Sequence, residues 1–114
     1  DPFGAGRRLG LELGRLAARP DGVIAYSDYL AAGMLAGLAA AGVKVPQELQ
    51  LVGFDDRELA GFTAPPLTTL AQPSYELGGT AAELLLRRLR NPGAPVESRS
   101  ILMNLIERNS TGEM

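Results

Sequence analysis

The chain has 114 residues, with 11 basic and 13 acidic side chains and a formal net charge of −2 at neutral pH. It contains no cysteine and no histidine, which excludes disulfides, a thiolate nucleophile and triads that need an imidazole base. A slightly acidic chain is a poor match for the DNA backbone, and no apolar run approaches the roughly 20 residues of a membrane span. We therefore expect no membrane segment, and no binding of DNA by this stretch alone.

Leucines at helical spacing predict a first helix from about residue 3 to residue 18. Asp1 followed by Pro2 suits the start of that helix, because proline in the first turn loses no hydrogen bond. Gly10 and Gly14 weaken a helix by about 1 kcal/mol each relative to alanine. Small residues at this spacing also allow another backbone to pack close to the helix.

An apolar, β-branched run over residues 22–26 predicts a buried strand of the parallel type. Ser27 and Asp28 follow it and can cap the next helix, which we expect over residues 29–41. That helix is apolar on all sides, which indicates burial on more than one face. Gly42 is suited to end it in the left-handed conformation.

The remaining segments complete an alternating pattern. We expect, in order, a buried strand over 49–54, an irregular or helical piece over 57–62, a short strand over 67–70, a helix over 75–90 capped by Ser74, and a strand over 99–107. This order predicts an α/β fold with a mostly parallel sheet flanked by helices. Because no strand precedes the first helix, we expect the chain to be an incomplete part of a larger domain.

Polar side chains follow three of the expected strands. Ser27 and Asp28 come after the first, Asp55 and Asp56 after the second, and Gln72 after the third. Ligands of open α/β sheets bind at the carboxyl ends of the strands, and a carboxylate, an amide and a hydroxyl together suit a neutral polyol. The alternatives are helix caps, a Mg²⁺ site or a paired-carboxylate hydrolase. Without a phosphate-binding loop or a lysine at a strand end, we expect no metal, no cofactor and no catalysis.

Six motifs in order resemble those of the LacI/GalR family of transcriptional regulators. They are GVIAYSD at 22–28, GVKVP at 42–46, LVGFDD at 51–56, PPLTT at 65–69 with QP at 72–73, LG at 77–78, and LIERNST at 105–111. The resemblance covers nearly the whole chain.

The resemblance implies a bacterial repressor or activator whose two-lobed effector domain is similar to periplasmic sugar-binding proteins. Residues 1–72 and about 99–111 would belong to the C-terminal lobe, and about 74–95 would supply a helix that packs on the N-terminal lobe. A helix-turn-helix headpiece, absent from this chain, would bind operator DNA in the cytoplasm. A periplasmic sugar-binding protein of a transport system is the alternative, because it shares these lobes.

The resemblance also carries residue roles. Asp55 matches the effector-binding aspartate of the family, and Gln72 matches a residue at the hinge that lines the pocket. Ser27 stands where the family has asparagine, so a hydroxyl replaces an amide, and Asp28 matches an aspartate that caps a helix at the pocket rim. The implied effector is a sugar or a purine.

The family dimerises through this lobe. The resemblance implies a homodimer interface whose candidate residues lie on the first two helices and after the second strand: Phe3, Arg7, Tyr29, Ala32 and Phe62. Effector binding would then favour one arrangement of the lobes and change the affinity for operator DNA allosterically.

Overall fold

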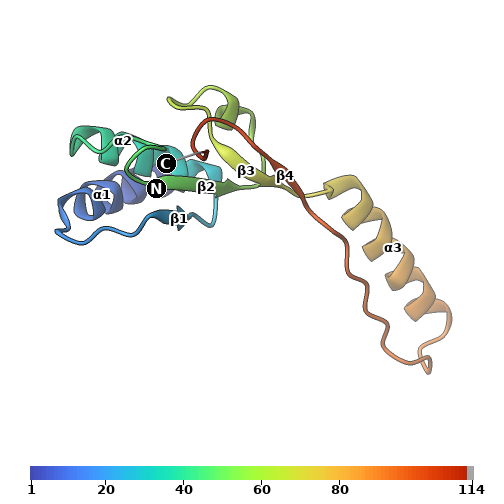
Figure 1. Ribbon diagram of the computed structural model, residues 1–114. Coiled ribbons are helices and arrows are strands. Elements are labelled where there is room, and N and C mark those ends of the chain that lie inside the picture. The colour runs from blue at the N-terminus through green and yellow to red at the C-terminus, as the bar shows by residue number, and fades with distance from the viewer. Residues whose placement is uncertain (113–114) are drawn as a thin grey trace. The chain divides into compact units, whose positions relative to one another are not determined.

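The computed structural model describes residues 1–112 and divides into two units (Figure 1). Residues 1–71 and 105–112 form the first unit, and Gln72–Asn104 form the second. The elements follow the order α1, β1, α2, β2, a short 3₁₀ helix, β3, α3, β4. This order is the predicted one, and the α/β fold class is confirmed.

Local sequence signals set the ends of the first two helices. α1 spans Pro2–Arg15, and the Asp1 carboxylate caps it by accepting a 2.7 Å hydrogen bond from the backbone N–H of Gly4. α2 spans Asp28–Ala40 and is capped by Ser27, whose hydroxyl accepts from the backbone N–H of Leu30 at 3.2 Å. Gly42 follows α2 with φ of +78°, as predicted for a left-handed helix end.

Glycines bring α1 and α2 into backbone contact, and the two helices lie side by side in Figure 1. A β-carbon at Gly6 or Gly10 would collide with backbone oxygens of α2, and one at Gly33 or Gly37 would collide with backbone oxygens of α1. The glycines of each helix therefore receive the backbone of the other. The close approach predicted for the small residues of the first helix is confirmed at Gly10.

The sheet has the strand order β1, β2, β3, β4. Its strands are β1 (Gly22–Ile24), β2 (Gln50–Phe54), β3 (Thr68–Ala71) and β4 (Asn104–Ile106). β1 and β2 are parallel, and so are β2 and β3. The carboxyl ends of these three strands consequently lie along the same edge of the sheet.

The core of the first unit lies between α2 and the sheet. α2 packs against both α1 and β2, which accounts for its apolar surface on all sides. The core consists of buried leucine, valine and methionine side chains together with three alanines: Ala25, Leu30, Ala31, Met34, Leu35, Leu38, Val43, Leu49, Leu51, Ala60 and Leu67.

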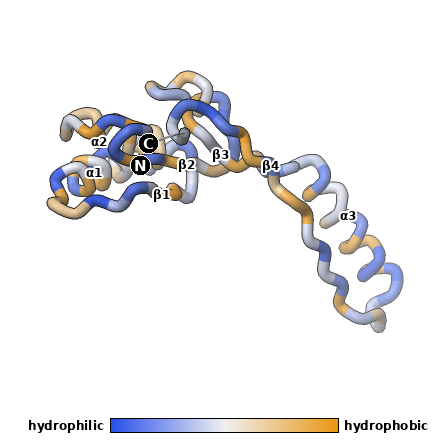
Figure 2. The backbone as a smooth tube through the Cα atoms, in the orientation of Figure 1, coloured by the Kyte–Doolittle hydropathy of each residue, from blue (hydrophilic) through white to orange (hydrophobic). Residues whose placement is uncertain are grey.

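One expectation of burial is wrong for the described residues. Ile24 of β1 is 75% exposed and Tyr26 is 70% exposed, although the run was expected to be a buried strand. The reason is that β1 lies at the edge of the sheet, with β2 as its one neighbour among residues 1–112. α3 (Ser74–Arg90) has a regular apolar stripe but no buried residue, and hydrophobic and hydrophilic residues alternate along it in Figure 2. Its N-cap is Pro73, without a side-chain hydrogen bond, rather than Ser74.

Ser110 ties the end of the chain into the first unit. It is completely buried, and its hydroxyl accepts a 2.8 Å hydrogen bond from the backbone N–H of Thr68 and donates to the carbonyl of Leu51. Its backbone N–H donates to the carbonyl of Pro66, and its carbonyl accepts from the N–H of Leu51. The residues after β4 are therefore joined to both β2 and the start of β3.

Close backbone contact between α1 and α2 makes a methyl group at Gly33 costly. We expect Gly33→Ala to lower the free energy of unfolding by about 3 kcal/mol, since overpacking that must move backbone lies at the upper end of measured costs. Gly78→Ala is the matched control, because Gly78 lies in α3 with open space around its Cα, and it should be neutral or stabilising by up to about 1 kcal/mol. Denaturant unfolding followed by circular dichroism measures both; equal effects would contradict the packing argument.

Candidate functional site

The candidate site lies at the carboxyl ends of the parallel strands. Ser27 follows β1 and Asp55 directly follows β2. The backbone N–H of Asp55 donates a 2.9 Å hydrogen bond to the carbonyl of Leu70, so the first residue beyond β2 stays against β3. Gln72 is the first residue after β3 and begins the second unit. The structure thus brings Asp55 to the predicted edge of the first unit, whereas Gln72 belongs to the other unit.

Asp55 and Asp56 form a strained turn. Their φ angles are +104° and +51°, in the region that residues with a β-carbon rarely adopt. Such conformations cost about 1–3 kcal/mol each and persist where surrounding contacts hold them, typically at binding and catalytic sites. Both side chains are half-buried. The turn after β2 is therefore the part of the first unit with the clearest structural sign of a binding role.

The Asp28 carboxylate holds this turn from inside the molecule. Asp28 is completely buried, and its Oδ2 accepts a 2.6 Å hydrogen bond from the backbone N–H of Arg57. Its Oδ1 accepts from the Thr69 hydroxyl, also at 2.6 Å. These two hydrogen bonds join the first turn of α2 to the loop after β2 and to β3.

Thr69 extends this network to the strained turn. While its hydroxyl hydrogen is donated to Asp28, its Oγ1 accepts a 3.3 Å hydrogen bond from the backbone N–H of Asp56. Gly53 in β2 leaves space for the carboxylate, because a β-carbon there would collide with Oδ1 of Asp28. The consecutive N–H groups of Asp56 and Arg57 are thus both satisfied by one buried side-chain network.

The predicted roles of Ser27 and Asp28 separate in the structure. Ser27, and not Asp28, is the N-cap of α2. Asp28 has no exposed surface, so it is placed to position the turn rather than to touch a ligand. Ser27 is partly exposed and stands at the strand-end edge.

Sequence reasoning missed two residues that support the turn, Thr69 and Arg108. Arg108 pairs with Asp56, with 2.8 Å between its Nη2 and Oδ1 of the carboxylate. Both lie in motifs noted above, PPLTT and LIERNST. Those motifs drew attention to the segments, but the contacts join residues 13 and 52 positions apart in the chain, which local patterns do not reveal.

Three of the candidate interface residues are aromatic side chains that reach the surface. Phe3 is 46% exposed, Tyr29 52% and Phe62 81%. Tyr29 and Phe62 line one shallow hollow, and Phe3 and Ala32 line a second one. Arg7 is exposed on α1 and lines neither hollow. Exposed aromatic residues gathered over neighbouring elements are typical of protein contact surfaces.

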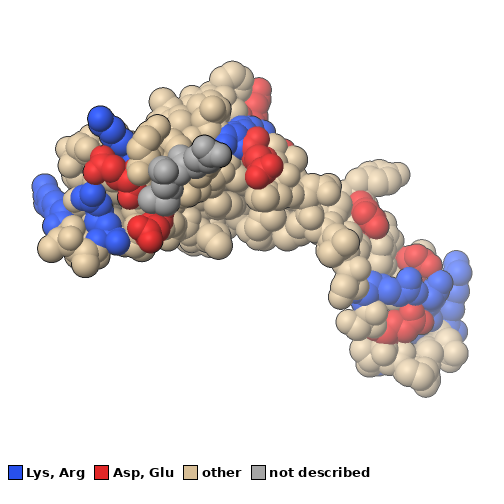
Figure 3. Space-filling view, in the orientation of Figure 1, with Lys and Arg blue, Asp and Glu red and all other residues tan. Residues whose placement is uncertain are grey.

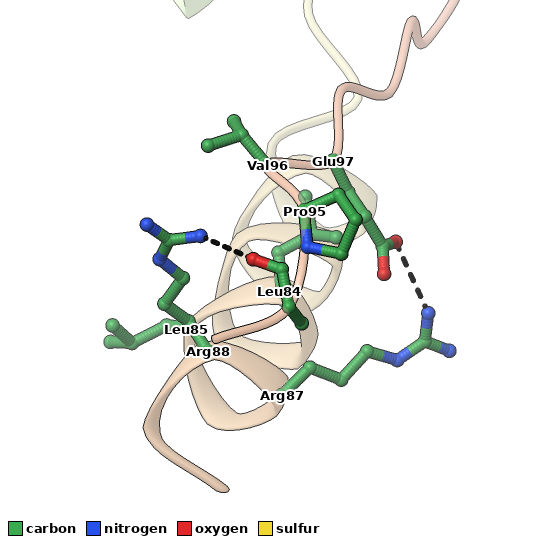
Figure 4. A pocket seen from close by; sticks show the side chains of 8 residues that line it. Leu84, Leu85, Arg87, Arg88, Pro95, Val96 and Glu97 are labelled. Atoms are coloured by element: carbon green, nitrogen blue, oxygen red, sulfur yellow. Dashed lines mark hydrogen bonds and ion pairs between the residues drawn. The ribbon is translucent and has the colours of Figure 1, made fainter. Parts of the chain in front are cut away.

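The second unit has a separate hollow between the last turns of α3 and residues 94–97 (Figure 4). Its two arginines are engaged locally: Arg88 donates to the carbonyl of Ala94 at 3.0 Å, and Arg87 pairs with Glu97 at 3.3 Å. Arg87 also pairs with Glu83 at 2.6 Å. Acidic and basic side chains lie beside one another on this unit in Figure 3. Both arginines of this hollow are therefore held by partners within the second unit.

Residues 1–112 contain neither a metal-binding cluster nor a membrane-spanning helix. No three His, Cys, Asp or Glu side chains of this part of the chain gather closely enough to hold a metal ion. None of the helices described there combines the length and the hydropathy needed to cross a membrane.

Comparisons with known proteins agree on one family. Residues 3–111 match the periplasmic binding protein-like domain. The chain is 40% identical over 109 residues to the HTH-type transcriptional repressor CytR of Escherichia coli K12, across 96% of the chain and 32% of that protein. It is 39% identical over 92 residues to the ribose operon repressor of the same strain, across 81% of the chain and 28% of that protein. These similar proteins are transcriptional repressors rather than enzymes.

A solved structure is similar over the same extent. The LacI family transcriptional regulator of Enterococcus faecalis V583 with bound ribose matches with a TM-score of 0.79 and 37% identity, across 96% of this chain and 40% of that one. The chain spans about a third of the length of the curated relatives named above, at 32% and 28%.

The Thr69 hydroxyl has one buried and one partly buried hydrogen-bond partner, so its loss should be costly. We expect Thr69→Val to lower the free energy of unfolding by about 1–3 kcal/mol, because the Asp28 carboxylate and the Asp56 N–H each lose a hydrogen bond. Thr69→Ser keeps the hydroxyl and should retain most of the stability. Thermal unfolding of the three proteins measures the difference, and equal losses in both variants would assign the effect to packing instead.

Proposed function

Because this chain belongs to the periplasmic binding protein-like domains of the LacI-family transcriptional regulators, we propose that it is the ligand-sensing and dimerisation part of a bacterial repressor. The observation that carries this proposal is the strained Asp55–Asp56 turn at the carboxyl end of β2. A turn that costs free energy and is held by a buried network is the part of the unit best suited to bind a ligand.

We propose that the ligand is a sugar. The Asp55 carboxylate would accept hydrogen bonds from sugar hydroxyls, and the Ser27 hydroxyl of the same unit would contribute a further polar contact. Gln72 stays the candidate residue of the second unit. The ribose bound to the similar regulator of Enterococcus faecalis supports this class. A purine is the alternative ligand class.

The proposed mechanism is a shift between two arrangements of a larger protein. A ligand that makes different contacts in the two arrangements favours one of them, and by linkage this changes the affinity for operator DNA. The chain passes between its two units at Ala71–Gln72 and again at Asn104–Leu105, and Gln72 stands at the first of these points. The CytR relative is named as a helix-turn-helix repressor, and a helix-turn-helix segment would likewise bind the operator DNA here. The protein would act in the cytoplasm.

We further propose that the protein is a homodimer. The interface would be formed by Phe3, Tyr29, Ala32 and Phe62, together with Arg7 on the exposed side of α1. Burying exposed aromatic rings supplies most of the free energy of such contacts, and a two-fold axis places the same patch on both partners.

The Asp55 carboxylate should be required for tight binding of the ligand. We expect Asp55→Ala to weaken the binding of D-ribose by about 10- to 100-fold, since hydrogen bonds to a charged group contribute about 1.5–3 kcal/mol. Asp21→Ala is the matched control, because Asp21 is exposed and precedes β1, at the opposite end of the strand. Isothermal titration calorimetry of the protein measures both affinities.

Two outcomes would contradict the proposal. If Asp55→Ala binds D-ribose as tightly as the unmodified protein, Asp55 is not a ligand residue. If ribose binds but leaves the affinity for operator DNA unchanged, the transport-protein alternative is favoured over a repressor.

The Phe62 side chain should be required for stable dimerisation. We expect Phe62→Glu to convert a dimer to a monomer or to raise the dissociation constant at least tenfold, because a buried unpaired carboxylate opposes association. Val96→Glu is the control, since Val96 is 83% exposed and lies in the other unit. Sedimentation equilibrium measures the association. Equal dissociation in both variants would contradict the proposed interface.

A further inference from the structure

We propose that Arg108 is a positioning residue for the ligand site, acting through Asp56 to hold the Asp55–Asp56 turn in its binding conformation. This inference rests on the proposed function, because it assigns the purpose of the turn to ligand binding. No part of the resemblance or of the strand-end argument assigns a role to Arg108.

The guanidinium of Arg108 has two fixed partners. Its Nη2 lies 2.8 Å from Oδ1 of Asp56, and its Nη1 donates a 2.9 Å hydrogen bond to the backbone carbonyl of Leu67. One partner is in the strained turn, and the other lies directly before β3. The planar guanidinium can serve both at once, whereas a lysine ammonium is a single point charge without that fixed fork.

The backbone of Arg108 is also held in place. Its N–H donates a 2.8 Å hydrogen bond to Oγ1 of Thr68. Ser110, two residues further on, is completely buried between Leu51 and Thr68. Arg108 therefore projects from an anchored segment, so ordering its side chain against Asp56 costs less conformational entropy than at a loose surface position.

The pair is better shielded from water than the other ion pairs described. The side chains of Arg108 and Asp56 are 25% and 30% exposed, whereas those of Arg87 and Glu83 are 50% and 54% exposed. Partial burial strengthens the attraction, because less water screens it. Asp55 and Asp56 are adjacent carboxylates, so the positive charge of Arg108 also offsets their mutual repulsion.

Three supports therefore converge on two consecutive residues. Thr69 accepts from the N–H of Asp56, Asp28 accepts from the N–H of Arg57, and Arg108 pairs with the Asp56 side chain. The first two fix the backbone beyond Asp55, and the third prevents the Asp56 side chain from turning away. Asp55 is then presented from a backbone that is held on its carboxyl side.

The experiment compares Arg108→Met, Arg108→Lys and the control Arg19→Met. Arg19 makes a similar ion pair with Glu48 at 3.1 Å, with side chains 29% and 40% exposed, and does not contact the turn. Two readouts are taken on the whole protein: the affinity for D-ribose by calorimetry, and the hydrogen-exchange rates of backbone amides by NMR without ligand.

We expect Arg108→Met to weaken ribose binding at least tenfold and to speed exchange of the Asp56 and Arg57 amides at least tenfold, with α1 and α2 unchanged. Arg108→Lys should recover part of the affinity because it keeps the charge opposite Asp56. Adding Asp56→Asn to Arg108→Met should cause little further loss, since both changes break one interaction. Arg19→Met should leave both readouts unchanged.

Two results would overturn the inference. One is native exchange at Asp56 and Arg57 in Arg108→Met; the other is faster exchange spread equally over α1 and α2, which would make Arg108 a residue of general stability. If the unmodified protein does not bind D-ribose, the proposed sugar function fails, and the exchange rates still decide whether Arg108 positions the turn.

Discussion

The first unit depends on one buried carboxylate. Asp28 has no exposed surface, yet each of its oxygens accepts a hydrogen bond, one from the Thr69 hydroxyl and one from the Arg57 N–H. A carboxylate removed from water is tolerated only when such donors replace its hydration. Any rearrangement that withdrew one donor would leave it buried without compensation, so α2, β3 and the loop after β2 keep their positions together.

The Asp28 carboxylate can hold the loop after β2 in place only because α2, which carries it, is itself fixed. Glycines let the backbones of α1 and α2 meet without side chains between them, as at Gly6 and Gly33. Because no side chain lies between the two backbones at these points, the helices cannot repack by a change of rotamer, so α1 fixes the position of α2. The position of α2 therefore fixes the Asp28 carboxylate, and the hydrogen bonds of that carboxylate fix the strained turn.

The sequence allowed the prediction of those features that depend on neighbouring residues. Helix and strand order, the caps at Asp1 and Ser27, and the place of Asp55 after β2 all follow from local patterns. The exposure of Ile24 could not be predicted in this way, because the burial of a strand depends on which elements lie beside it. The Arg108–Asp56 pair likewise joins residues 52 positions apart. The periodicity of a sequence indicates helices and strands, but it does not show which distant residues come into contact.

The path of the chain between the units has a consequence for how the protein can vary. The Gln72–Asn104 unit leaves from the end of β3 and returns into β4, and these strands are neighbours in the sheet. Topologically it is therefore an insertion between two adjacent strands, much as a long hairpin loop would be. Changes in its length or sequence therefore need not pass through the core beneath α2, and the Asp28 network can stay the same while this unit varies.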